Sequence, residues 1–394
     1  MMREVAVIGY GMSKFGRRDD STLMDMLREA STVAIKTAGA EKGDIDTLYV
    51  ASMLSGELSK QTAIGTALAD ELSLLPVPAD RIENGPASGA SAVKQAVLAV
   101  GSEVYDLALV VGGEKMRHAP SNEVAELLAS MTHPTAEYVQ GVTLPSLAAM
   151  FAMLYMQRYG VERKHLSLIA IKNHRNALKN PHAHLHRPLT LEGIYSLPEA
   201  EVNNPVVSEP LRLFDCCPIT DGAASVLLCP AERANEFTDE PVTIAGFGQA
   251  TDSLALQDRD DPTVLQAVRK SSDKAFQMAG VTPKDIDFAE LHDAFTILEI
   301  AESEDAGFFE KGTAHKAVEE GVTELDGDLP INTSGGLKAR GHPVGATGVA
   351  QIVELAQQLR GEAEERQVAD AEYGYSCNFG GFGNNVLSFV LRRG

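Results

Sequence analysis

The segment GVTPKDIDFAELHDAF at residues 280–295 repeats the pattern of an earlier segment, GAEKGDIDTLYVAS at residues 39–52. Both begin with glycine and reach Asp-Ile-Asp after the same number of residues. Each follows an apolar, β-branched run that ends in glycine, VAVIG at residues 5–9 and VTIAGFG at residues 242–248. Such runs are typical of strands buried on both faces. The sequence therefore predicts an internal duplication of about 240 residues.

The parts between and after these segments repeat as well. Amphipathic stretches at about residues 22–38 and 262–279 predict a helix in each copy. The run DLALVVGGEKM at residues 106–116 has its counterpart in EYGYSCNFGG at residues 372–381, since each leads into paired glycines. We expect two similar α/β halves, each with a mixed sheet and covering helices.

A segment of different composition interrupts the first copy. Residues 117–205 are rich in His, Asn and Met and contain helical stretches, and an insertion of this kind is where a substrate-binding lid would lie. The apolar run LRLFDCCPITDGAASVLLCP at residues 211–230 would complete the first half. The predicted organisation is a first half at residues 1–116 plus 206–240, an inserted loop domain at residues 117–205 and a second half at residues 241–394.

Composition narrows the class of protein. The chain has 394 residues, of which 44% are hydrophobic, and no apolar run approaches the roughly 20 residues of a membrane span. The start, MMREVAVIGYG, lacks the regions of a secretory signal, so we expect a cytoplasmic location. A net charge of −21 argues against nucleic-acid binding, which needs clustered Lys and Arg.

The four cysteines are Cys216, Cys217, Cys229 and Cys377. They show no C-x-x-C spacing, and two adjacent cysteines suit neither a disulfide framework nor a zinc site. We interpret all four as reduced thiols, place Cys216 and Cys217 in the core, and expect no metal site.

Four motifs could carry chemistry: ENGPASGASAVKQAVLAV at residues 83–100, ELHDAF at 290–295, NTSGGLKARGHPVGATGVAQIVEL at 332–355 and CNFGGFGNN at 377–385. Each alone could serve packing, as a glycine-rich helix start or a buried cysteine does. The polar Glu-x-His-Asp group on an apolar run is unusual, because buried ionisable groups are paired or functional.

Together, in this order, the motifs resemble those of thiolases, over essentially the whole chain. The HDAF form is similar to the branch that includes sterol carrier protein-type and archaeal thiolases. The resemblance implies two duplicated βαβαβαββ halves in a five-layered αβαβα fold. It also implies CoA thioester substrates that bind beneath the inserted loop domain, without a permanently bound cofactor.

The same resemblance assigns roles to residues. His342 would activate a nucleophile, Cys377 would shuttle the substrate α-proton as acid and base, and His292 would help hold the thioester oxygen. The backbone N–H of Gly380 would serve the oxyanion, although Phe379 is an equally placed donor.

The chain departs from the family at the nucleophile. Where the pattern has cysteine, this sequence has Pro86, which offers neither a thiol nor a backbone N–H. One hypothesis is that Ser88 replaces the thiol with His342 as its base, which requires a short approach between the two. The protein would then remain an acetyl-CoA C-acyltransferase, acting by Claisen condensation or thiolysis.

Two alternatives remain open at this point. The histidines and Cys377 could act only as acid and base in aldol or retro-aldol chemistry on a β-hydroxyacyl-CoA. The chain could also be a non-catalytic subunit of a heteromeric complex. The resemblance further implies a homodimer or tetramer, and a small partner protein that combines a zinc ribbon with an OB fold.

Overall fold

The first half alternates strands and helices and closes with two strands separated by the insertion. The computed structural model describes residues 2–196 and 200–394. In chain order the elements of this half are β1 (Val5–Met12), α1 (Leu23–Thr37), β2 (Thr47–Ala51), α2 (Ile64–Glu71), β3 (Ala79–Ile82), α3 (Ser88–Gly101), β4 (Ala108–Glu114) and, after the insertion, β7 (Gly222–Pro230).

The second half follows the same order. Its elements are β8 (Val242–Thr251), α8 (Gln266–Ala279), β9 (Phe288–Glu290), α9 (Thr296–Asp305), α10 (Ala314–Glu319), α11 (Thr347–Leu359), β10 (Tyr373–Gly380) and β11 (Asn385–Arg393). The counterpart of β3 is reduced to a single parallel bridge between Ala289 and Ile331. The βαβαβαββ pattern is otherwise present twice.

The strand order confirms the duplication. The nine strands run β3-β2-β4-β7-β1-β8-β11-β10-β9, so that the order outward from β1 is repeated outward from β8. The two halves meet where β1 and β8 pair antiparallel, at Ala6 with Thr243 and Val7 with Val242. β2 and β4 are parallel, as are β9 and β10, while β7 and β11 run antiparallel to their neighbours.

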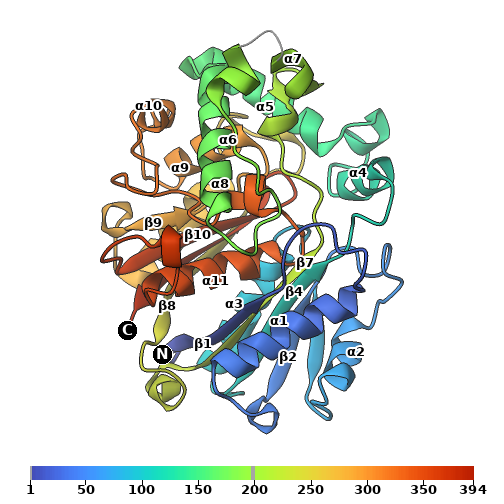
Figure 1. Ribbon diagram of the computed structural model, residues 1–394, viewed down its shortest axis with the longest axis vertical. Coiled ribbons are helices and arrows are strands. Elements are labelled where there is room, and N and C mark those ends of the chain that lie inside the picture. Colours follow the sequence, from blue (N-terminus) through green and yellow to red (C-terminus); the bar gives the residue numbers. More distant parts are fainter. Residues whose placement is uncertain (1, 197–199) are drawn as a thin grey trace.

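The helices form layers on the sheet faces (Figure 1). α1 packs on β1, β4 and β7, and α8 packs on β8 and β11. α3 and α11 contact each other and, between them, strands of both halves, so they form the central layer. This arrangement agrees with the five-layered αβαβα fold expected from the sequence.

Matching glycines set the outer helices close to the strands. A Cβ on Gly9 would lie 2.3 Å from the carbonyl oxygen of Ala34 in α1. A Cβ on Gly246, its counterpart, would lie 2.2 Å from the carbonyl oxygen of Ala275 in α8. Gly9 and Gly246, which end or lie within the repeated apolar runs, therefore allow the same close approach of helix to strand in both halves.

The segment between β4 and β7 covers one end of the central layer, toward the top of Figure 1. It contains α4 (Ser121–Ala129), α5 (Leu144–Tyr159), α6 (Arg163–Leu178), α7 (Ala200–Asn203) and the short strands β5 (Val206–Ser208) and β6 (Leu211–Arg212). Residues of α5 and α6 share a buried hydrophobic cluster with α9 and β10. Within the described ranges, every helix is too short or too polar to cross a membrane.

Candidate active site

An apolar cavity of about 170 Å³ lies where the two halves and the insertion meet. An apolar cavity of roughly 150 Å³ can hold a molecule the size of benzene, so a small acyl group has room here. Pro86 lines it from the start of α3, His292 from the end of β9, His342 from the loop before α11, and Phe379 from the end of β10. Residues of the insertion also line it, among them Leu128, Leu144 and Pro145.

His342 is held in one tautomer. Its Nδ1 lies 2.6 Å from Oγ1 of Thr347, and that hydroxyl donates to the carbonyl oxygen of Pro343 at 3.0 Å. Because the hydroxyl has a single hydrogen, its oxygen accepts from Nδ1–H, and Nε2 carries a lone pair. Burial, aided by the charge of Arg340, lowers the pKa of His342 to about 3. The ring is therefore a neutral base.

His292 is held in the opposite tautomer. Its Nδ1 accepts from the backbone N–H of Phe379 at 3.2 Å and from the side-chain amide of Asn378 at 3.0 Å. A nitrogen that accepts from a backbone N–H has no hydrogen, so Nε2 carries it. Burial and then His342 lower the pKa of His292 well below its ordinary value. His292 is thus a neutral donor.

The two rings meet at right angles. Their centroids are 5.1 Å apart at 89°, and the His292 ring stacks on Phe379 at 5.0 Å and 8°. The backbone N–H of His292 donates to both carboxyl oxygens of the buried Glu302, at 3.0 Å each. One imidazole can therefore donate to an oxygen while the other accepts a proton from a neighbouring atom.

Ser88 does not meet His342, contrary to what the serine hypothesis requires. Its hydroxyl donates to the carbonyl oxygen of Gly85 at 2.5 Å and accepts from the backbone N–H of Asn84 at 2.9 Å. The side chain is fully buried and is not part of the cavity wall, whereas Pro86 is. Ser88 instead stabilises the loop that leads into α3.

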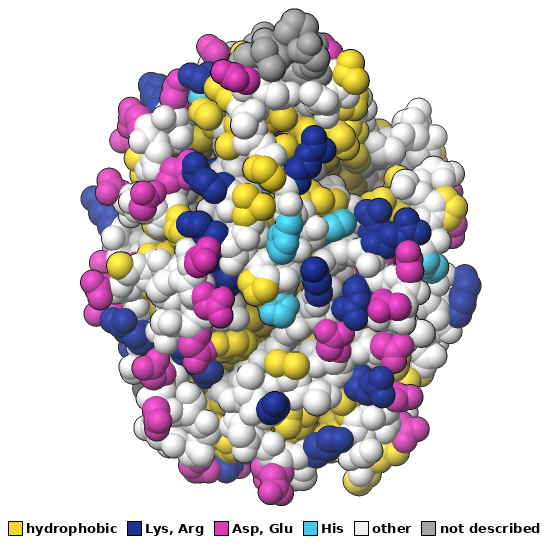
Figure 2. Space-filling view, viewed as in Figure 1, with side chains coloured by type: hydrophobic (Ala, Val, Ile, Leu, Met, Phe, Trp, Pro, Cys, Tyr) yellow, Lys and Arg dark blue, Asp and Glu magenta, His cyan; other side chains and the backbone are white. Residues whose placement is uncertain are grey.

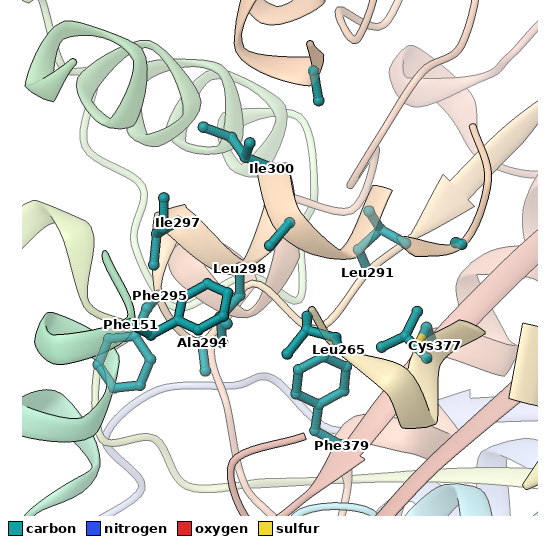
Figure 3. Close-up of a cluster of buried hydrophobic side chains, with 14 of the residues drawn as sticks. Phe151, Leu265, Leu291, Ala294, Phe295, Ile297, Leu298, Ile300, Cys377 and Phe379 are labelled. Carbon is teal, nitrogen blue, oxygen red and sulfur yellow. The ribbon is translucent and has the colours of Figure 1, made fainter. Parts of the chain in front are cut away.

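Cys377 also does not line the cavity. It is fully buried in β10, and Figure 3 shows it with Phe379 among the hydrophobic side chains around the start of α9. The hydroxyl of Ser388 donates to its sulfur at 3.8 Å. Burial and the neighbouring Glu302 carboxyl group raise the pKa of Cys377 well above its usual range. The structure thus brings the two histidines together on the cavity wall, whereas the expected acid-base thiol is buried and does not line it.

Comparison with known proteins assigns the chain that forms this cavity to a family. Residues 5–232 match the model of the thiolase N-terminal domain, and residues 248–393 match the model of the thiolase C-terminal domain-like family. The chain belongs to the thiolase family. Acetyl-CoA acetyltransferase of Methanothermobacter thermautotrophicus is 44% identical over 392 residues, covering 100% of both chains, and the protein of the same name from Methanocaldococcus jannaschii is 40% identical, covering 99% of both.

Other proteins are similar to this thiolase chain at lower identity, one by sequence and two by structure. Human sterol carrier protein 2 is 28% identical and covers 100% of this chain and 72% of its own. The solved Ltp2-ChsH2(DUF35) aldolase matches 99% of this chain and 98% of its own with a TM-score of 0.83 at 24% identity. Human mitochondrial 3-ketoacyl-CoA thiolase, solved with CoA, matches 100% and 98% with a TM-score of 0.75 at 17% identity.

Gly380 differs from its expected thiolase role as an oxyanion donor. A Cβ there would lie 2.8 Å from the carbonyl oxygen of Asn84, so the glycine allows β10 to approach the loop before α3. The neighbouring Phe379 and Gly381 line the cavity instead, and the N–H of Phe379 is already donated to His292. Of His292, Gly380 and Phe379, the side chain that lines this thiolase cavity with a free N–H is that of His292, and its role as an oxyanion donor stays a prediction.

The sequence did not indicate two groups of residues at this thiolase site. Thr347, Asn378 and Glu302 fix the histidines, and they fall within or near the recognised motifs without a signal of their own. Cys216 and Cys217 line the cavity, whereas the sequence interpretation placed them in the core. The indication in the sequence was that the two cysteines are adjacent, an arrangement that suits neither a disulfide framework nor a metal site.

Proposed function

We propose that this thiolase is an acyltransferase that forms or cleaves the carbon–carbon bond next to the carbonyl of a CoA thioester. The observation that carries the proposal is the pair of neutral, oppositely protonated imidazoles, His292 and His342, on the wall of an apolar cavity. The names of the relatives at 44% and 40% identity support the same reaction class.

The two imidazoles divide the chemistry. Nε2–H of His292 donates to the thioester oxygen and stabilises the negative charge that develops there. Nε2 of His342 removes the α-proton, and the resulting enolate attacks an acyl carbonyl. Thiolysis runs the same steps in reverse. A low-dielectric site strengthens both interactions, since few waters compete with them.

Hydrogen exchange at the α-carbon tests this division. In D₂O the enzyme should exchange the methyl hydrogens of acetyl-CoA, measured by NMR. His342→Ala should abolish the exchange, and His292→Ala should slow it by about a hundredfold or more, the loss seen when an oxyanion donor is removed. His315→Gln, outside the cavity on α10, serves as the control. Unchanged exchange in His342→Ala would contradict the proposal.

Pro86 favours a second candidate, aldol or retro-aldol cleavage of a β-hydroxyacyl-CoA. This reaction needs an oxygen donor and a base but no acyl-enzyme, so a proline at residue 86 does not impair it. Release of an aldehyde from a β-hydroxyacyl-CoA, with no transfer of an acyl group to CoA, would decide in its favour.

We also propose that the apolar surface of α5 binds the small OB-fold partner expected from the sequence. Met150, Met153 and Leu154 expose 44%, 56% and 41% of their surface there, and large exposed apolar patches mark interaction sites. Met153→Glu should weaken copurification of such a partner.

The oligomeric state is a separate proposal. We expect a homodimer or tetramer, and light scattering on the same sample measures which of the two forms.

A further inference from the structure

The cavity contains thiols that the proposed chemistry has not used. Of the side chains that line it in the described parts of the chain, four can form covalent bonds or transfer protons: His292, His342, Cys216 and Cys217. The remaining lining residues are apolar or glycine. An acyl-enzyme formed in this cavity therefore requires one of the two thiols, because Pro86 has no nucleophile and Ser88 and Cys377 are outside the wall.

Cys217 lies between the segments that carry the two histidines. Its backbone N–H donates to the carbonyl oxygen of Ala294 at 2.9 Å, two residues beyond His292. Two residues further on, Ile219 forms a parallel bridge with His342. The main chain around Cys217 is thus fixed to both segments.

A buried cation accompanies the thiol. Lys338 exposes only 1% of its surface. It lies 5.7 Å from the ring centroid of Phe214. Burial lowers the pKa of Lys338, and the opposing charge interactions are led by Cys217, followed by Cys216. A buried ammonium group near a thiol stabilises the thiolate as it forms.

The resting thiol is protonated and needs a base. Burial raises the pKa of Cys217 to about 12, although Lys338 opposes the shift. Cys216 is less favourable, because burial, Cys217 and Asp215 raise its pKa further, and its N–H is directed to Leu213. The neutral Nε2 of His342 is the available base on the same wall.

We propose that Cys217 is the acyl carrier of this enzyme, in place of the thiol that is missing at residue 86. The sulfur attacks the acyl-CoA carbonyl while its proton passes to Nε2 of His342. The carbon–sulfur bond to CoA then breaks, and the CoA thiolate takes that proton. The products are acyl-Cys217 and free CoA, one thioester replaced by another. The proposal rests on the proposed acyltransferase function.

The test is trapping of a labelled acyl group. The full chain is incubated with radiolabelled acetyl-CoA, quenched in acid and digested, and the adduct is mapped by mass spectrometry. We expect a hydroxylamine-labile adduct on Cys217 that falls at least about tenfold in Cys217→Ala. Cys217→Ser, which tests folding of the site, should give a slower, hydroxylamine-resistant oxygen ester. Ser88→Ala and Cys229→Ala should retain the label.

An adduct on Ser88 or Cys216, or label undiminished in Cys217→Ala, would overturn the proposal. Acyl transfer by the unmodified enzyme without any adduct would overturn it as well. The α-hydrogen exchange of the unmodified enzyme is measured in parallel. If α-hydrogen exchange is absent while Cys217 is labelled, the result supports Cys217 as the acyl carrier and contradicts the proposed roles of the histidines. If exchange proceeds without an adduct, the roles of the histidines stand and the carrier fails.

Discussion

Pro86 stands at the cavity end of α3, where the thiolase pattern has cysteine. Proline lacks both the thiol and the backbone N–H that cysteine would supply there. The two losses can be separated, because Pro86→Ala restores only the N–H and Pro86→Cys restores both. We expect Pro86→Cys to raise the thiolysis rate by at least about tenfold, since one oxyanion donor alone is worth roughly 10²–10³ in rate. Pro86→Ala should give a smaller gain and no new iodoacetamide-sensitive thiol. Equal behaviour of the two variants would show that residue 86 is not a site for the nucleophile.

Thr347 determines which nitrogen of His342 is the base. Thr347→Val keeps the shape of the side chain but leaves Nδ1–H buried without its 2.6 Å partner. We expect a loss of about 1–3 kcal/mol in the free energy of unfolding, the penalty for a buried unpaired donor, and a slower α-hydrogen exchange. Urea denaturation and NMR measure the two effects. Thr347→Ser, which keeps the hydroxyl, should recover both, and failure to do so would assign the effect to packing.

The low pKa of His342 predicts an unusual pH profile. An ordinary imidazole base loses activity below its pKa of about 6.5, whereas a base with a pKa of about 3 remains neutral and active. The exchange rate should therefore change less than about twofold between pH 5.5 and 7.5. An acidic limb with a midpoint near 6.5 would contradict the buried, neutral ring. Between pH 6.5 and 3 the unfolded chain binds more protons at this residue, so its contribution to stability is lost as the pH falls.

At the scale of elements, the crossing of α3 and α11 determines the position of the site. A Cβ on Gly348 in α11 would lie 2.2 Å from the backbone nitrogen of Ala90 in α3 and 2.6 Å from Oδ1 of Asn378. Gly348→Ala should cost about 1–3 kcal/mol through overpacking and should displace Asn378 from His292, which slows exchange. Gly43→Ala, with no atom within 4 Å of the added Cβ, is the matched control. Similar melting temperatures for both variants would refute the tight crossing.

The fold was predictable because its signal recurs. The Gly-x-x-x-x-Asp-Ile-Asp segment and the strand glycines occur twice, and two copies of one unit must bury equivalent faces. The counterpart of β3 was not predictable, because a single bridge at Ile331 has no strand-length pattern. The histidines were located by motif, and their tautomers depend on hydrogen bonds that only the three-dimensional arrangement supplies.

The exact position of each side chain limited the prediction of the site. Cys377 and Phe379 are two residues apart on the same strand, yet only Phe379 borders the cavity. Ser88 lies two residues from Pro86, yet its hydroxyl bonds to the backbone of Gly85 and does not face the cavity. A spacing of two residues moves a side chain several ångströms along a strand, so motif matching alone cannot distinguish these cases.

At the scale of the whole molecule, the net charge of −21 opposes the compact state. Acidic and basic side chains are interspersed on the face shown in Figure 2, so the repulsion is spread over the surface and is open to screening by salt. The Debye length falls from about 10 Å at 0.1 M salt to about 3 Å at 1 M. Buried ion pairs such as Arg340–Glu290 and Arg366–Glu354, whose side chains are at most 4% exposed, are screened much less.

Salt should therefore stabilise this protein. We expect the melting temperature to rise between 0.1 M and 1 M salt, by less than about 2–4 °C for each kcal/mol gained, because that shift applies to domains of roughly 150–250 residues and falls with chain length. NaCl and KCl at equal ionic strength should act alike if screening is the cause. A difference between the two salts would indicate a specific ion site, and a melting temperature that falls with salt would show that attractive surface pairs outweigh the excess of acidic charge.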